Sequence, residues 1–349
     1  MRACVRVGTA SSRMGRMSDP NREGKAVAHL LLLGAGFTRN WDGWLAGELA
    51  DDLISRLAEN RDLCKRLTDN PNFEEVLGDL QREWHHHQQP AHHERLNLME
   101  RAVRASFNDM NAMLADRPGL EFQGNGPNFV QRSITSFLAR FDALFTLNQD
   151  LLLELFYVPQ DPRISVRYPG MALPPNFWNL RPAEKLAADW QPRPDGEYRV
   201  ERQGQPVFKL HGSVNWRSED GNDLLVMGAR KVEAIAGSAL LTRYADEFRA
   251  RLRERGSRLM TIGYGYGFGD EHVNQAIVDA AEADETFGMF VVNPSGRKAL
   301  RPRNDTGQIP QPRRAIEDVR YIGGSTRSLR TTFTNDELER AKLVRFFDV

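Results

Sequence analysis

The stretch AVAHLLLLGAGFT, residues 26–38, joins an uninterrupted apolar run to a turn that contains two glycines. An apolar run of this length that stops at glycines is typical of a strand buried on both faces of a parallel sheet. From Trp44 to Leu57 the apolar residues recur every three or four positions, which predicts a helix. Strand, glycine turn and helix in this order predict the first unit of an α/β fold.

Further apolar segments are predicted strands, at residues 141–146, 207–210, 259–263 and 288–292. These strands end in polar or glycine-bearing loops, and helical patterns follow several of them. The pattern predicts a three-layer, doubly wound, Rossmann-like α/β fold with a mainly parallel sheet, in which ligands bind at the carboxyl ends of the strands. We expect the chemistry in the loops that begin at Gly34, Thr146, His211 and Gly263, with Asn293 at the margin.

The composition is that of an ordinary globular protein. The 349 residues are 40% hydrophobic and 27% charged, with 47 basic and 47 acidic residues. The formal net charge of zero gives no reason to expect direct binding to nucleic acid or to a membrane, and no apolar run approaches the roughly 20 residues of a membrane helix. Two cysteines, Cys4 and Cys64, cannot form a disulfide framework or a four-cysteine zinc site, which favours a cytoplasmic location.

The chain divides by composition into three parts. Residues 1–25 are predicted to be a flexible tail, because they are rich in Arg, Ser and Gly and lack an apolar segment. Residues 26–300 are predicted to form the α/β domain, with a helical insertion at about 46–135 and a proline-rich segment at about 158–205. Residues 301–349 are expected to be an extension available for oligomer or partner contacts.

The turn Gly34-Ala35-Gly36-Phe37-Thr38 is the first candidate binding site. Glycines let the backbone approach a diphosphate, and the start of a helix offers free N–H groups to an anion. Arg39 interrupts the G-x-G-x-x-G pattern, and tight strand–helix turns without a nucleotide also use glycines. Nucleotide binding and an ordinary turn therefore both remain open for this motif alone.

Two other strand ends carry polar side chains. His211 follows one strand, and an imidazole is a good general base because its pKa lies near neutral pH. Asn148 and Asp150 follow another strand. A lone histidine is often structural, and Asn148 or Asp150 would also serve as a helix cap.

Taken together in chain order, the motifs resemble the sirtuin superfamily. The order is Gly-Ala-Gly, Asn-x-Asp, Lys-Leu-His-Gly, Gly-Tyr-x-x-x-x-Gly-Asp-x-His-x-Asn and Val-Val-Asn-Pro. The chain is more closely similar to the SIR2-like domains of bacterial anti-phage defence systems. The resemblance covers the α/β core, at about residues 27–45, 138–156, 206–217 and 258–295.

The resemblance implies a role for each matching position. Residues 34–38 would hold the NAD diphosphate, Asn148 and Asp150 would lie near the nicotinamide and its ribose, and His211 would be the catalytic histidine. On the adenosine side, the implied contacts are Gly263, Tyr264, Gly265 and Asn293.

Two departures from the deacetylases of this superfamily bear on the activity. The chain cannot build their zinc module of two C-x-x-C pairs, so no zinc is expected and the site is predicted to contain no metal. Their Gly-Ile-Pro-Asp-Phe-Arg stretch is replaced by Asn-Trp-Asp-Gly-Trp-Leu at residues 40–45. The resemblance to the defence-type domains implies instead that NAD+ is a substrate, hydrolysed to nicotinamide and ADP-ribose, with no further cofactor.

The resemblance also implies partners. An enzyme that depletes NAD+ would be toxic if always active, so we expect activation by a phage signal or by a partner such as an ATPase-helicase, a short Argonaute or another accessory subunit. A homo-oligomer is expected as well. Two alternatives stay open: a subunit that senses NAD or ADP-ribose without turnover, and a protein deacylase or ADP-ribosyltransferase.

The histidine cluster at residues 85–93 and the pair His272 and Asn274 remain without a firm assignment. The cluster of five histidines between His85 and His93 is interpreted as a solvated polar stretch, because the contiguous triplet does not share one helix face. His272 and Asn274 match the family pattern and are consistent with either helix-start structure or catalysis.

Overall fold

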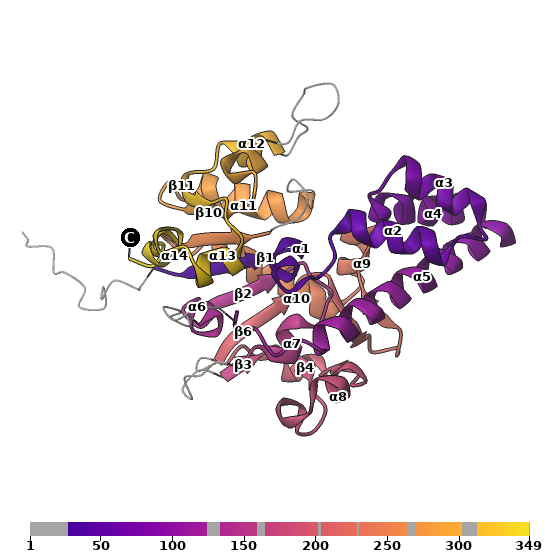
Figure 1. Ribbon diagram of the computed structural model, residues 1–349, viewed down its shortest axis with the longest axis horizontal. Helices are drawn as coiled ribbons and strands as arrows, with labels where there is room; N and C mark the ends of the chain where they lie inside the picture. The colour runs from indigo at the N-terminus through magenta and orange to yellow at the C-terminus, as the bar shows by residue number, and fades with distance from the viewer. Residues whose placement is uncertain are drawn as a thin grey trace, which may run out of the picture.

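A computed structural model describes residues 27–123, 133–158, 165–201, 204–228, 230–263, 270–301 and 313–348. Its centre is a seven-stranded sheet in which every paired strand runs parallel to its neighbours (Figure 1). In spatial order the strands are β11 (Tyr321–Ser325), β10 (Gly288–Val292), β9 (Arg258–Ile262), β1 (His29–Leu33), β2 (Ala143–Thr146), β6 (Gly204–Lys209) and β3 (Ser165–Arg167). The predicted doubly wound parallel sheet is confirmed.

Strand β1 lies at the middle of the sheet and pairs with β2 on one side and β9 on the other. Its four leucines, residues 30–33, have no exposed surface, as expected for a strand covered on both faces. From β1 the chain adds β2, then the edge strand β3, and then β6 between β2 and β3. It next returns to the other side of β1 and continues through β9, β10 and β11. The direction of winding therefore reverses between β1 and β9, which is where ligands bind in folds of this kind.

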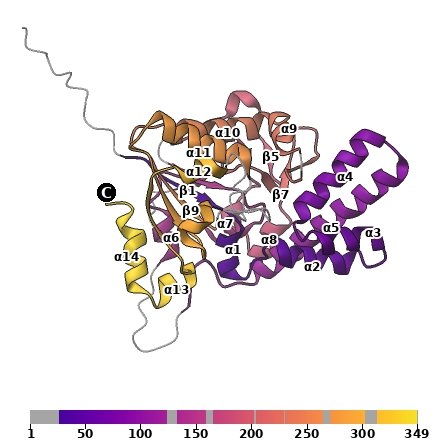
Figure 2. The same ribbon diagram turned by 90° about the horizontal axis from the view of Figure 1, so that it is seen from above.

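Helices cover both faces of the sheet, which gives three layers (Figure 2). On one face lie α10 (Ala239–Leu252), α11 (Glu271–Ala283) and α12 (Arg313–Glu317), and on the other lie α6 (Ile134–Leu138), α13 (Leu329–Thr334) and α14 (Glu337–Arg345). Phe248 of α10 packs edge-on against Phe145 of β2, with ring centroids 4.8 Å apart. No described helix combines the length and apolar character needed to cross a membrane.

Between β1 and β2 the chain forms a helical insertion that projects beyond the sheet (Figures 1 and 2). Its helices are α2 (Ala46–Arg56), α3 (Arg61–Asp69), α4 (Phe73–His87) and α5 (Pro90–Ala115). They share the apolar core through residues such as Leu53, Leu63 and Leu77, which are nearly or completely buried. The amphipathic spacing that predicted helices here therefore reflects a buried apolar stripe on each helix.

The proline-rich segment forms short elements that cover the end of the sheet at β3 and β6. These are β4 (Met171–Ala172), α8 (Pro182–Leu186) and β5 (Gln191–Pro192), followed after β6 by the hairpin of β7 (Gly212–Arg217) and β8 (Asp223–Leu225). Trp190 and Trp216 are fully buried and stack with centroids 6.3 Å apart. Lys185 donates to the carbonyl oxygens of Glu154 and Leu155, which ties α8 to the sheet domain.

The described part of the C-terminal segment, which was expected to be an extension available for oligomer or partner contacts, completes the sheet. Residues 321–325 form β11, which pairs in parallel with β10 at the edge. Phe346 packs against Phe290 of β10, and Phe347 packs against Phe141, with centroids 5.9 and 4.9 Å apart. Apolar contacts with the core therefore hold this segment in place.

Candidate functional site

The glycine turn after β1 is bound directly to the end of β9. Gly34 N–H donates to the carbonyl of Ile262 at 3.1 Å, and Gly36 N–H donates to the carbonyl of Gly263 at 3.2 Å. Phe37 N–H donates back to the carbonyl of Gly34 at 2.8 Å, which starts the short helix α1 (Ala35–Thr38). Three N–H groups of the turn therefore have protein acceptors. A diphosphate at this turn remains a prediction, and it would need other donors or a shift of the Gly263 loop.

The turn and the β9 loop approach each other more closely than side chains allow. A Cβ built on Gly36 would lie 2.8 Å from the Cα of Gly263. A Cβ on Gly263 would lie 2.4 Å from the backbone of Gly36, and Gly263 has a φ of +55° that only glycine adopts readily. Contact between the two loops is thus sufficient reason for glycine at both positions.

Replacing Gly36 by Ala is therefore expected to lower the free energy of unfolding by about 1–3 kcal/mol, the usual cost of inserting a methyl group into a packed region. Chemical denaturation measures this change. Gly47→Ala is the matched control, because a Cβ there meets no atom within 4 Å and the position is exposed in α2. The control should be neutral or stabilising by up to about 1 kcal/mol. Equal stability of the two variants would contradict the close contact.

Asn148, Thr38 and Asp150 form a hydrogen-bonded group where β1 and β2 end. The Thr38 hydroxyl donates to Asp150 Oδ2 at 2.8 Å and accepts from Asn148 Nδ2 at 2.8 Å. Thr38 and Asp150 are buried, whereas Asn148 is partly exposed. These bonds fix the Asn148 amide at the edge of a small cavity of about 10 Å³, enough for one water.

Asp150 also serves the helix that follows. Its Oδ1 accepts the N–H of Leu152 at 3.0 Å, at the start of α7 (Leu152–Phe156). The helix-capping interpretation therefore holds for one carboxylate oxygen, while the other oxygen binds Thr38.

A buried ion pair lies directly behind this group. Lys209 Nζ contacts Glu154 Oε1 at 2.7 Å, and both side chains are only 2% exposed. The same ammonium donates to the Asp150 carbonyl at 2.5 Å and to the Ser213 hydroxyl at 2.7 Å. Burial raises the pKa of Glu154, and the charge of Lys209 opposes that effect. Lys209 thereby joins the strand end that carries Asn148 to the strand end that carries His211.

The register of the sheet brings Asn148 and His211 to equivalent positions. Thr146 of β2 is paired with Lys209 of β6, and each functional residue follows two positions later. Neighbouring strands lie about 4.8 Å apart, so the two side chains leave the sheet at the same edge from adjacent strands. Leu210 N–H donates to the Thr146 carbonyl at 2.9 Å and continues the pairing toward the site.

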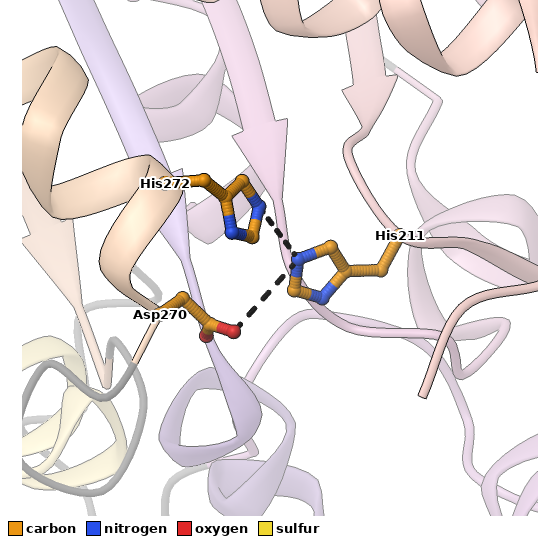
Figure 3. Close-up of side chains that lie close together, drawn as sticks. All are labelled: His211, Asp270 and His272. Carbon is orange, nitrogen blue, oxygen red and sulfur yellow. Dashed lines mark hydrogen bonds and ion pairs between the residues drawn. The ribbon is translucent and has the colours of Figure 1, made fainter. Parts of the chain in front are cut away.

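His211 is buried and faces residues from the start of α11 (Figure 3). Its Nε2 lies 3.2 Å from Nε2 of His272 and 3.9 Å from Oδ1 of Asp270. Two Nε2 atoms at this distance form a hydrogen bond when one ring carries the proton on that nitrogen. The Gly-Asp-x-His pattern therefore contributes both Asp270 and His272 to the surroundings of His211.

Both imidazoles are held in the neutral form. Burial lowers the pKa of His211 to about 3; Asp270 opposes the shift, and Lys231 and His272 add to it. Burial also lowers the pKa of His272, again against the effect of Asp270. At neutral pH each ring therefore keeps one nitrogen lone pair.

An ion-pair chain connects this group to the helical insertion. Lys231, at the start of α9 (Lys231–Ala236), lies 2.9 Å from Asp270 Oδ1 and 2.5 Å from Glu74 Oε2 in the first turn of α4. Burial alone would raise the pKa of Asp270, but the neighbouring His211 and Lys231 lower it to about 2. Burial lowers the pKa of Lys231, yet Asp270 and Glu74 outweigh it and raise the value. Glu74 and Lys231 were not among the residues predicted from the sequence.

The remaining predicted residues are Asn293, Tyr264, Gly265 and Asn274. Asn293 lies after β10, where its side chain accepts the N–H of Ser295 at 2.8 Å and its own N–H donates to the Ser325 carbonyl. Asn293 thus caps its own turn, and its contact with adenosine remains a prediction. Tyr264 and Gly265 lie outside the described residues. Asn274 is fully buried in α11.

Comparison with known proteins agrees with this architecture. Residues 142–312 match the family model described as the SIR2-like domain. The matched segment contains Asn148, Asp150, His211, Asp270 and Asn293, and it begins after the glycine turn and the helical insertion. No curated protein matches the chain. The match shows that this segment is similar to a SIR2-like domain.

Proposed function

We propose that the chain hydrolyses NAD+ to nicotinamide and ADP-ribose. The observation that carries the proposal is the hydrogen-bonded group of Asn148, Thr38 and Asp150, one strand away from His211 and beside the point where the sheet reverses its winding. The SIR2-like match over residues 142–312 supports NAD as the ligand.

The reaction needs little acid–base catalysis for its leaving group. The nicotinamide ring nitrogen is cationic in NAD+. When the N-glycosidic bond breaks, this nitrogen takes the electron pair and nicotinamide leaves as a neutral molecule. Water then bonds to the ribose carbon and loses one proton. The protein has to hold the ribose, exclude bulk water and orient the attacking water.

We assign the orienting role to Asn148 and His211. The Thr38 hydroxyl fixes the amide of Asn148, which suits it to hold a ribose hydroxyl or the water. His211 is neutral at working pH, so its Nε2 can exchange the hydrogen bond with His272 for one accepted from the water or from a ribose hydroxyl. A pKa of about 3 makes the His211 ring a weak base, so we propose that its main role is to orient the water or the ribose. If His211 takes up a proton, the carboxylate of Asp270 stabilises the imidazolium.

We further propose that the chain acts as an anti-phage effector whose activity is controlled by a partner or by self-association. The supporting feature is the ion-pair chain from Glu74 through Lys231 to Asp270, since it joins the projecting insertion to the surroundings of His211. A protein bound to the insertion, such as an ATPase-helicase, a short Argonaute or another accessory subunit, could act on the site through these charges.

The test is a nicotinamide-release assay on the purified chain, alone and with any protein that co-purifies with it. Nicotinamide and ADP-ribose should appear in equal amounts, and Asn148→Ala should abolish both. Asn108→Ala, on the exposed face of α5, is the matched control and should retain full activity.

Three results would contradict the proposal. NAD+ binding without nicotinamide release in either preparation would indicate a sensing subunit. Nicotinamide release only in the presence of an acylated peptide would indicate a deacylase. Transfer of ADP-ribose to protein in place of free ADP-ribose would indicate a transferase.

A further inference from the structure

One cluster in the described part of the chain has the geometry of a metal site. His211, Asp270 and His272 each offer one ligand atom, and these atoms all lie within 4.8 Å of one another. The residues come from two places in the sequence, the turn between β6 and β7 and the start of α11 (Figure 3). The five histidines at residues 85–93, which are exposed except for the partly buried His92, do not form such a group.

We propose that His211, His272 and Asp270 bind one divalent transition-metal ion of the zinc type, and that the bound ion inhibits the enzyme. The binding part stands on the geometry of the cluster alone. The inhibitory part rests on the proposed function, in which His211 acts on the substrate or its attacking water.

The two imidazole nitrogens already stand at the right separation. Zinc–nitrogen bonds are about 2.0–2.1 Å long, so two nitrogens on a tetrahedral ion lie roughly 3.3–3.4 Å apart. The observed distance between Nε2 of His211 and Nε2 of His272 is 3.2 Å. Oδ1 of Asp270, at 3.9 Å from His211, would reach the ion after a small side-chain movement. Three protein ligands leave one position for water, as in exchangeable zinc sites.

The protonation states also suit a metal ion. Ligating histidines must be neutral and ligating carboxylates ionised. Burial keeps the pKa of both histidines low, and His211 and Lys231 keep that of Asp270 low. Lys231 lies between two carboxyl groups, those of Asp270 and Glu74, so a metal ion would not meet an uncompensated positive charge. Lys231 would also orient the carboxylate, the role that outer-shell partners have in metal sites.

The donor set determines which ions should bind. Imidazole favours zinc, copper, nickel and cobalt, whereas magnesium and calcium prefer sites built only from oxygen. We therefore expect Zn²⁺ and Co²⁺ to bind and Mg²⁺ and Ca²⁺ to have no effect. Once coordinated, Nε2 of His211 has no lone pair left to accept a hydrogen bond from substrate or water, and hydrolysis should stop.

The binding test uses the full chain, freed of metal with EDTA, and contains no NAD+. Calorimetric titration with Zn²⁺ should show one site, and Co²⁺ should give the strong visible absorption of a tetrahedral ion. His272→Gln, which keeps most of the side-chain volume, and Asp270→Asn should each weaken Zn²⁺ binding by at least roughly tenfold, because loss of even an outer-shell partner has that effect. His86→Ala with His87→Ala removes two exposed histidines and should leave binding unchanged.

The outcomes are separable from those of the proposed function. Undiminished Zn²⁺ binding in His272→Gln, or no binding to the wild-type chain, would overturn the metal site whatever the enzyme does. Circular dichroism and thermal unfolding show whether each variant is folded, and Zn²⁺ should raise the unfolding temperature of the wild type but not of His272→Gln.

In the nicotinamide assay, Zn²⁺ should inhibit the wild type and EDTA should restore its activity. Binding without inhibition would refute the inhibitory part alone, and no nicotinamide release under any condition would refute the proposed function alone.

Discussion

Replacing Glu154 by Gln is expected to lower the free energy of unfolding by about 3–5 kcal/mol, the usual cost of leaving one partner of a buried ion pair unpaired. Lys209 would keep its bonds to the Asp150 carbonyl and the Ser213 hydroxyl, but it would remain charged after losing its ion-pair partner. The Lys209 ammonium contacts the loop after β2, helix α7 and the start of the β7–β8 hairpin, so all three should lose stability. Urea unfolding followed by circular dichroism measures the change.

Two controls show whether the loss of stability comes from the unpaired, buried charge of Lys209 or simply from removing a carboxylate. Glu184→Gln removes an exposed carboxylate paired with Arg181, and the unfolding curve should stay close to that of the wild type, because solvent screens such a pair. Combining Glu154→Gln with Lys209→Met should recover much of the loss, because an apolar replacement removes the stranded charge. A loss below about 1 kcal/mol for Glu154→Gln alone would show that water reaches Lys209.

Replacing His211 by Asn is expected to reduce the rate of nicotinamide release by roughly 100-fold or more, the cost of misplacing a reacting group. Asparagine keeps a polar side chain of comparable breadth in the buried pocket, and the fold should therefore survive. The measurement is kcat under saturating NAD+, with thermal unfolding as a check on folding. The control is His86→Ala, an exposed position in α4 that should retain wild-type activity.

The pH dependence of kcat/KM for the wild type should reflect the low pKa of the buried His211 ring. With a pKa near 3, His211 remains neutral from weakly acidic to alkaline pH. In protein treated with EDTA, kcat/KM should therefore lack the fall near pH 6.5 that an ordinary histidine base produces. A clear decline centred on pH 6.5, absent from the Asn variant, would show that His211 titrates as an exposed ring does.

The fold was predictable because its main signals are local. A buried run of leucines at residues 30–33 and a helical period after it depend only on neighbours in sequence. Strand β11 could not be assigned in this way, since the run Tyr321–Ser325 contains Gly323 and Gly324. Its extended form depends on pairing with β10 at the edge of the sheet, which is a tertiary interaction.

The candidate site was predictable where its residues follow strands. Asn148, Asp150 and His211 stand directly after apolar runs, and parallel strands bring such positions to one edge. Glu74 and Lys231 carry no comparable signal, because a charged residue in the first turn of a helix has the same appearance whether it faces solvent or a buried site. Only the packing of the insertion against the sheet domain brings them together.

If the ion pairs that run from Glu74 to Asp270 couple the insertion to the site, that coupling must be reciprocal. If a protein bound at the insertion changes the affinity of the site for NAD+ by some factor, NAD+ must change the affinity for that protein by the same factor. A cell with abundant NAD+ would then alter how tightly the regulator is held, and falling NAD+ would alter it in the opposite sense. The affinity of the insertion for the regulator would thus depend on the NAD+ concentration, just as the affinity of the site for NAD+ would depend on the regulator.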